Sequence, residues 1–170
     1  YDNGYINGIL VICPNGVKGT WKKEIEIHMA DHVDRNVVIW TGQKTKKHEE
    51  ELSSVFIADK VHFNILIMNV DTFATERGRR FADRYLMTRR ALMVVDESTM
   101  IKNPTAIRTK AITKLGNLAR YRVIMTGSPV TKSPEDLYAQ CNFLNHELLG
   151  FSSIYTFRNR HCQLQRLSFG

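Results

Sequence analysis

Two adjacent carboxylates, Asp96 and Glu97, directly follow an apolar run over residues 91–95. A continuous apolar run of this length is typical of a buried strand in a sheet that is covered on both faces. Acidic residues after such a strand emerge at its carboxyl end, where open α/β sheets bind their ligands. One carboxylate can hold a hydrated Mg²⁺ while the other orients or deprotonates a water molecule. The pattern predicts the acidic half of a nucleotide triphosphatase site.

The same dipeptide also has a purely structural interpretation. Acidic residues after a strand can cap the next helix and favour its N-terminus. On the dipeptide alone the two interpretations are equally good, because short motifs carry little specificity. Successive residues of a strand point to opposite sides, so we expect Asp96 and Glu97 to have different roles.

A second apolar run, over residues 122–126, ends in hydroxyl residues around a glycine, in the order Thr126, Gly127, Ser128. In a parallel sheet these hydroxyls are expected at the same edge as Asp96 and Glu97. There they can bond a carboxylate or a bound phosphate, and Gly127 allows close backbone approach. Taken singly, the block is better explained as a β-turn built on Gly-Ser-Pro.

A third block predicts contact with a nucleic-acid backbone. The strand expected over residues 8–13 leads into a helix whose N-terminal amides can bind phosphate. Side chains with the right chemistry follow at Lys18, Thr20 and Lys22. Trp21 shares a helical stripe with Ile25, which predicts a core anchor rather than a base-stacking residue.

Strands and helices are predicted to alternate along the whole chain. Strands are expected over residues 8–13, 36–40, 63–68, 91–95 and 122–126. Helices are expected over residues 17–29, 44–56, 81–90, 104–118 and 153–161, and also after a cap at Ser133, with Leu137, Cys141 and Leu144 on one face. The alternation predicts a single α/β domain over residues 1–170, with a mainly parallel central sheet and helices on both faces.

Composition agrees with a folded domain that has a polyanionic partner. The 170 residues are 43% hydrophobic and 24% charged, which is enough to bury a core. A formal net charge of +7 makes nucleic acid the first candidate partner, with simple solubility as the alternative.

Cysteine usage and hydropathy exclude other classes. Cys13, Cys141 and Cys162 lie far apart, so neither a disulfide framework nor a structural zinc site is expected, and a reducing intracellular compartment fits best. No apolar run is long enough for a bilayer, so no membrane partner is expected. The sequence opens with Tyr1 and has no initiator methionine, so we expect it to be part of a longer protein.

Taken together, these blocks resemble superfamily-two helicases and translocases, and most closely their Swi/Snf-like branch. The resemblance runs over nearly the whole chain, and blocks in a fixed order are more specific than any single block. Blocks similar to motifs Ia, Ib, II and III stand in that order at residues 10–14, 69–73, 96–104 and 125–129.

The resemblance implies most of the first RecA-like lobe, a three-layer sandwich that uses ATP and Mg²⁺. It implies that Asp96 holds Mg²⁺ through water and that Glu97 positions the attacking water. It implies an intracellular protein, in the cytoplasm, nucleoid or nucleus, with double-stranded DNA and a second RecA-like lobe of the same chain as partners. By the same resemblance, Thr99, Thr126, Gly127 and Ser128 couple nucleotide state to DNA, and Lys18, Thr20, Lys22 and Thr72 contact DNA.

The chain departs from the family pattern in two places. Ser98 and Thr99 stand where motif II usually has Ala and then His or Asp, so the coupling is expected to be altered. A phosphate-binding loop of the form Gly-x-x-x-x-Gly-Lys-Ser/Thr does not occur, and residues 42–45 only imitate one. We expect that loop upstream of Tyr1, and the second lobe with its arginine fingers downstream of Gly170.

Three expectations follow for the chain by itself. It should be catalytically inactive and bind DNA without sequence preference. The strand over residues 122–126 should form an open edge, because the missing phosphate-loop strand would normally lie beside it, and self-association through this edge is expected. Two alternatives remain: a non-catalytic nucleic-acid-binding or interaction module, and the translocase subunit of a restriction system.

Overall fold

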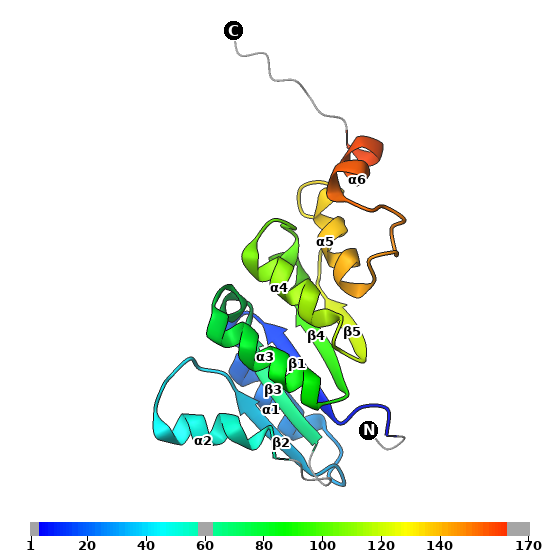
Figure 1. Cartoon of the computed structure of the whole chain (residues 1–170). Coiled ribbons are helices and arrows are strands. Elements are labelled where there is room, and N and C mark those ends of the chain that lie inside the picture. Colours follow the sequence, from blue (N-terminus) through cyan, green and yellow to red (C-terminus); the bar gives the residue numbers. More distant parts are fainter. Residues whose placement is uncertain (1–3, 58–62, 163–170) are drawn as a thin grey trace.

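The computed structural model describes residues 4–57 and 63–162, and its centre is a five-stranded, all-parallel sheet (Figure 1). The strand order is β2-β3-β1-β4-β5. The strands are β1 (Gly8–Cys13), β2 (Arg35–Ile39), β3 (Phe63–Asn69), β4 (Ala91–Asp96) and β5 (Tyr121–Met125). The α/β fold with a parallel sheet, predicted from the sequence, is confirmed.

The helices lie on both faces of this sheet, with α3 and α4 on one face and α1 on the other (Figure 1). The α-helices are α1 (Lys18–His28), α2 (Lys46–Ser54), α3 (Glu76–Thr88), α4 (Ile107–Gly116), α5 (Glu135–Leu144) and α6 (Ile154–His161). Short 3-10 helices follow three of the strands: η1 (Asn15–Val17), η2 (Val70–Ala74) and η3 (Ser98–Ile101). Within the described residues, no helix combines the length and apolar character needed to cross a bilayer.

The apolar runs of the central strands are buried because each strand contributes to two cores. Leu10 of β1 and Met93 of β4 are register partners and belong to the core beneath α3 and α4. Val11 and Ile65, on the opposite face, belong to the core beneath α1, where the partly buried Trp21 packs. Alternation along each strand therefore fills both faces, which explains why the runs are continuous rather than alternating.

Two predicted helix starts are wrong. α3 begins at Glu76 rather than near residue 81, because Thr75 caps it and accepts a hydrogen bond from the Gly78 amide at 3.1 Å. α4 begins at Ile107 rather than at Pro104. Before it, the Asn103 side chain accepts hydrogen bonds from the amide and hydroxyl of Thr105, which favours a turn over a helix there.

The predicted cap and buried face of α5 are also wrong. Ser133 makes no side-chain cap, and Pro134 occupies the N-cap position. The helix buries Tyr138, Ala139 and Phe143, whereas the predicted stripe of Leu137, Cys141 and Leu144 is only partly buried. The reason is that α5 packs against α4, β5 and η3 at once, which turns a different side inward.

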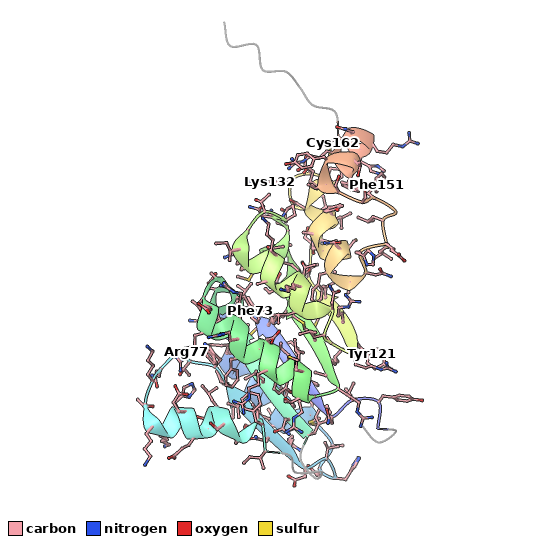
Figure 2. The ribbon with its side chains drawn as sticks, viewed as in Figure 1. Phe73, Arg77, Tyr121, Lys132, Phe151 and Cys162 are labelled. Atoms are coloured by element: carbon pink, nitrogen blue, oxygen red, sulfur yellow. The ribbon has the colours of Figure 1, made fainter. Side chains whose placement is uncertain are left out.

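β5 is an edge strand with an apolar face exposed on the α1 side of the sheet. Tyr121, Val123 and Met125 are 45%, 40% and 44% exposed (Figure 2 labels Tyr121). They pair in register with Leu92, Val94 and Asp96. Ile9 and Val11, the β1 partners of Leu92 and Val94, face α1. The helix α1 packs against β2 and β3 on this side, so among the described residues the half of the sheet nearest β5 stays open.

Candidate functional site

Asp96 is the last residue of β4 and is held at the carboxyl edge of the sheet from two sides. Its Oδ2 accepts a hydrogen bond from the Trp21 indole Nε1 at 2.8 Å, and its Oδ1 accepts one from the Glu97 amide at 2.9 Å. The residue is only half-buried. Each carboxylate oxygen can accept a further bond, so a hydrated cation can still bind there.

Glu97 lies just beyond the strand in a left-handed conformation, with φ 48° and ψ 57°. Among the described residues it is the only non-glycine with positive φ. Such a backbone costs on the order of 1 kcal/mol and is found mostly at functional sites. The expectation that Asp96 and Glu97 would alternate along one strand is wrong, because the chain turns at Glu97 into η3. The turn leaves the Glu97 side chain exposed.

The 126–128 block lies at the same edge as the two carboxylates. Asp96 is the register partner of Met125, so Thr126 begins beside it. The block satisfies its own polar groups: Thr126 Oγ1 accepts from the Ser128 amide, and Ser128 Oγ donates to the Val130 carbonyl, both at 3.2 Å. Within the described chain, neither hydroxyl bonds to Asp96 or Glu97. Gly127 and Ser128 remain exposed.

A buried amide connects η3 to the loop after β5. Ser98 is 0% exposed, and its hydroxyl donates to Gln140 Oε1 on α5. Gln140 Nε2 in turn donates to the Pro129 carbonyl at 2.8 Å. Thr99, one of the residues that the resemblance assigns to coupling, makes no side-chain hydrogen bond to the 126–128 block among the described residues. Ser98, at the position where the family usually has Ala, makes the connection instead.

The Asp136 side chain also holds the loop that follows β5. Its Oδ2 accepts hydrogen bonds from the Thr131 amide and hydroxyl and from the Lys132 amide at 2.7–2.9 Å. The Thr131 hydroxyl contributes most to holding the Asp136 pKa well below its usual range, the two amides and Lys102 add to it, and burial opposes it. Lys102 Nζ donates to the Thr131 hydroxyl and lies 3.6 Å from Asp136 Oδ2.

Sequence reasoning missed the roles of Gln140, Asp136 and Lys102. For Asp136 the one signal was the pair Thr131 and Lys132, a hydroxyl and two amides that stand five and four positions before this carboxylate. Gln140 had one signal: it is an amide on a helix face that also carries Ala139 and Phe143, and a buried amide needs partners.

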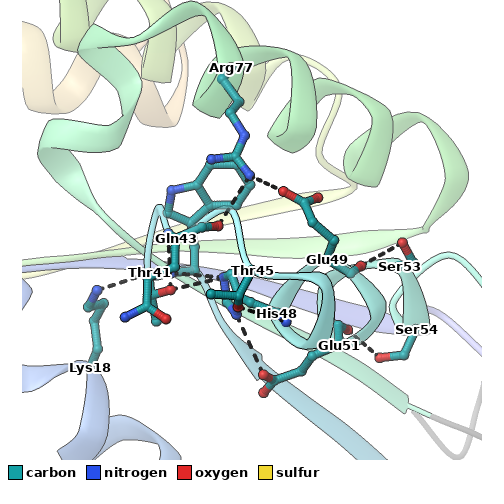
Figure 3. A network of polar contacts seen from close by, with 11 residues as sticks. Lys18, Thr41, Gln43, Thr45, His48, Glu49, Glu51, Ser53, Ser54 and Arg77 are labelled. Carbon is teal, nitrogen blue, oxygen red and sulfur yellow. Dashed lines mark hydrogen bonds and ion pairs between the residues drawn. The ribbon is translucent and has the colours of Figure 1, made fainter.

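A polar pocket of about 500 Å³ opens at the carboxyl ends of β1, β2 and β3. Its lining includes Lys18, Thr41, Asn69, Asp71, Thr72 and Arg77. On its basic side Lys18 Nζ donates to the Trp40 carbonyl at 2.9 Å, and Arg77 donates to the Gly42 carbonyl at 3.0 Å. Arg77 is also paired with Glu49 of α2, as Figure 3 shows. The Arg77 guanidinium also lies 5.0 Å from the Trp40 ring centroid. Two fixed cations with amide and hydroxyl neighbours suit a phosphate backbone.

The predicted DNA-contacting residues do not form one surface. Lys18 and Thr72 line the pocket, but Thr72 is buried and its hydroxyl donates to Asn69 Oδ1. Thr20 is exposed on α1 outside the lining, and Lys22 lines a separate pocket with Glu26. Lys22 shares a helix face with Lys18 but lies one turn further along α1, which runs away from the sheet edge, so only Lys18 lines this pocket. Arg77, on α3, lines the same pocket as Lys18.

Cys13, at the carboxyl end of β1, is not a nucleophile. Burial, reinforced by the Asp96 carboxylate and opposed by Lys18, raises the pKa of its thiol to about 11. A protonated thiol is unreactive near neutral pH.

The residues at the edge fit a hydrated Mg²⁺ and not a metal cage. In the part of the chain that the structure describes, no three His, Cys, Asp or Glu side chains are placed to hold a metal together. Mg²⁺ usually keeps several waters and takes only one or two carboxylates from the protein. Asp96, with free acceptor capacity on both oxygens, meets that requirement.

Comparisons with known proteins identify the family. A model described as the SNF2-related domain matches residues 2–165. The Caenorhabditis elegans protein named SWI/SNF-related matrix-associated actin-dependent regulator of chromatin subfamily A-like protein 1 homolog is 26% identical over 162 residues, which cover 91% of this chain and 20% of that protein. The Arabidopsis thaliana ISWI chromatin-remodeling complex ATPase CHR11 is 30% identical over 155 residues, covering 89% and 13%.

The fold also has a solved counterpart. The Sulfolobus solfataricus SWI2/SNF2 ATPase core in complex with dsDNA superposes with a TM-score of 0.63 and 24% identity, over 93% of this chain and 29% of that one. The parallel sheet is thus that of a RecA-like lobe. The chain spans about a fifth or less of the length of the two relatives above. From the family match over residues 2–165, this chain belongs to the SNF2-related domain family.

Proposed function

We propose that this chain is the greater part of the first RecA-like lobe of an ATP-dependent translocase of Swi/Snf type, which couples ATP hydrolysis to movement on duplex DNA. The observation that carries the proposal is the placement of Asp96 and Glu97 beside the 126–128 block at one sheet edge. The family match and relatives named as chromatin and repair proteins support it, and they also support an intracellular location.

In this proposal the two carboxylates divide the work. Asp96, oriented by Trp21, binds the waters of Mg²⁺, which when bound supplies positive charge to the triphosphate. Glu97, exposed at the turn, positions the attacking water. Ser98, Gln140 and Asp136 hold the loop that follows Thr126, Gly127 and Ser128, so a shift at the carboxylates reaches that loop. Thr99, the residue after Ser98, lies next to this hydrogen-bonded connection and is not one of the residues that form it.

The open half of the sheet supports a further unit in the complete protein. β5 has a free edge and an exposed apolar face, and the sequence has no phosphate-binding loop. A strand with a helix, carrying that loop, would pair with β5 and cover Tyr121, Val123 and Met125. The second RecA-like lobe would supply the arginine fingers, which contribute about 10³–10⁵ in rate.

The basic pocket at β1–β3 is the proposed contact with the DNA backbone. Lys18 and Arg77 provide the charge, and Asn69 and Thr41 provide hydrogen-bonding groups. Thr20, exposed on α1, is a peripheral contact, and Thr72 acts by holding Asn69. Lys22 belongs to the same helix but to another pocket, so its contribution is long-range charge only.

The proposal is tested in the gene product that contains this chain with its phosphate loop and second lobe. Glu97→Gln should abolish ATP turnover while leaving ATP binding largely intact, because an amide cannot take a proton from water. Asp96→Asn should also weaken Mg²⁺-ATP binding. Glu50→Gln, exposed on α2, is the matched control and should turn over ATP normally. Near-normal turnover in Glu97→Gln would remove the catalytic assignment.

The 170-residue chain by itself is proposed to be a non-catalytic DNA-binding module. It has the acidic pair but neither a phosphate-loop lysine nor an arginine finger. Its binding to duplex DNA should be nonspecific and should fall steeply with salt, because counterions are released. Fluorescence anisotropy across a salt series measures this. Stoichiometric ATP binding with DNA-stimulated hydrolysis by the chain alone would contradict the proposal.

A further inference from the structure

A second polar pocket, of about 290 Å³, lies between α4 and α5 and shares no residue with the pocket at β1–β3. Its polar lining consists of Thr109, Lys110, Thr113, Lys114, Asn117 and Asn142. No carboxylate of the described residues lines it. The pocket therefore offers positive charge, hydroxyls and amides together, a combination that recognises an anion.

The two lysines are brought together by helix geometry. Lys110, Thr113, Lys114 and Asn117 follow the i, i+3, i+4, i+7 spacing that places residues on one helix face. Among the described residues neither lysine has an acidic partner within ion-pair distance. Two like charges one turn apart repel each other, so an anion bound between them would relieve that repulsion.

Thr109 provides independent evidence that this pocket suits a ligand. It is only 2% exposed, it lines the pocket, and its hydroxyl oxygen has no hydrogen-bond partner within the described chain. Buried hydroxyls in folded proteins almost always have a partner, because leaving one unpaired is costly. An acceptor oxygen in the pocket would satisfy the Thr109 hydroxyl.

We propose that the α4–α5 pocket binds a phosphate group. Lys110 and Lys114 neutralise its charge, the hydroxyls of Thr109 and Thr113 donate to its oxygens, and Asn142 donates from the α5 side. The phosphate can belong to a nucleic-acid backbone or to a small phosphate compound, since the recognised group is the same. This site goes beyond the proposed function, which uses none of these side chains.

The first test is calorimetric titration of inorganic pyrophosphate into the 170-residue chain. The wild-type chain should bind one pyrophosphate at the α4–α5 pocket, and the double variant K110Q/K114Q should bind there at least about tenfold more weakly, the effect of losing charge-assisted hydrogen bonds. Any binding at the β1–β3 pocket should be the same in both. The matched control is K46Q/K47Q, which removes the same charge from the exposed face of α2 and should bind like wild type. Equal weakening in both double variants, or none in K110Q/K114Q, would overturn the site.

Thr109→Val separates a binding role from general charge. Valine has the same shape without the hydroxyl, so the melting temperature of the ligand-free chain should rise, because an unpaired buried group is removed. Pyrophosphate should then raise the melting temperature less than it does in wild type. A lower melting temperature with unchanged pyrophosphate affinity would show that the hydroxyl has another partner and would contradict the proposal.

A competition experiment identifies the source of the phosphate. If the group is a backbone phosphate, a short DNA duplex should displace pyrophosphate, and K110Q/K114Q should lose more DNA affinity than K46Q/K47Q. If it belongs to a small compound, the duplex should not compete. Failure here is distinguishable from failure of the proposed function, because ATP turnover in Glu97→Gln does not depend on the α4–α5 pocket.

Discussion

The Trp21 indole Nε1 donates a 2.8 Å hydrogen bond to Oδ2 of Asp96, across 75 positions of sequence. Trp21 lies on α1 and packs against the core beneath that helix, so its ring cannot turn freely. The orientation of the acidic side chain therefore depends on the position of α1. The same helix begins at Lys18, which lines the basic pocket, so one rigid element touches both parts of the candidate site.

Trp21→Phe should lower the stability of the folded chain, because the hydrogen bond to Asp96 is lost. A hydrogen bond to a charged acceptor contributes about 1.5–3 kcal/mol, and phenylalanine keeps most of the ring packing. The free energy of unfolding should therefore fall by that order, as measured by urea denaturation. A double-mutant cycle with Asp96→Asn isolates the pair and should give a coupling of about 1 kcal/mol or more. Fully additive effects would mean that the bond is not formed in solution.

Gly78→Ala should destabilise the chain although alanine is the better helix former. A Cβ at Gly78 would lie 2.4 Å from the Thr72 carbonyl oxygen, which cannot move without shifting η2. Overpacking of this kind costs about 1–3 kcal/mol, more than the gain in helix propensity of about 1 kcal/mol.

Gly19→Ala is the matched control for that substitution. Gly19 also lies in a helix, and its Cβ would meet nothing within 4 Å. It should leave the free energy of unfolding unchanged or raise it by up to about 1 kcal/mol. Thermal or urea unfolding of both variants tests this. The free energy of unfolding should fall in Gly78→Ala and should stay the same or rise in Gly19→Ala. A stabilised Gly78→Ala chain would show that α3 does not press on Thr72.

Asp136→Asn should destabilise the chain in a pH-dependent way. The folded-state pKa of Asp136 is depressed, chiefly by the Thr131 hydroxyl, so its contribution is present above the unfolded pKa of about 3.9. That contribution is lost as pH falls below 3.9 toward the folded pKa. Near pH 7 the variant should be less stable by about 1–3 kcal/mol, because the amide loses charge-assisted bonds.

Unfolding curves of wild type and Asp136→Asn over a pH series test the direction of this pH dependence. The difference between the two chains should shrink as pH falls below about 3.9. A difference that stays constant across the series would exclude ionisation of Asp136 as its source.

Val123→Lys should reduce self-association of the 170-residue chain. Val123 lies on the exposed face of the edge strand β5, and a charge at such an edge opposes pairing with another copy. Sedimentation velocity should show wild-type chain in concentration-dependent oligomers and the variant shifted to monomer. Val130→Lys is the matched control, because Val130 lies in the loop after β5 and is 41% exposed, against 40% for Val123. This variant should leave the distribution of monomer and oligomers unchanged. Equal behaviour of the two variants would place the contact elsewhere.

The sequence alone determined the elements that carry the candidate site. Apolar runs over residues 8–13, 91–95 and 122–126 predict three strands, and alternation with helices predicts that they are parallel. Parallel strands bring their carboxyl ends to one edge, so the meeting of Asp96 with the 126–128 block follows from local pattern and topology.

Only the tertiary structure decided which side chains touch. The Trp21–Asp96 bond and the Ser98–Gln140 bond join residues 75 and 42 positions apart, and no local periodicity encodes such a distance. Each depends on how a whole helix rotates against the sheet, which is set by the sum of many packing contacts. The docking of α5 buried Gln140, and the direction of α1 placed Lys22, one turn beyond Lys18 on the same helix face, in another pocket. What each turn of a helix contacts is decided only when the whole helix is docked.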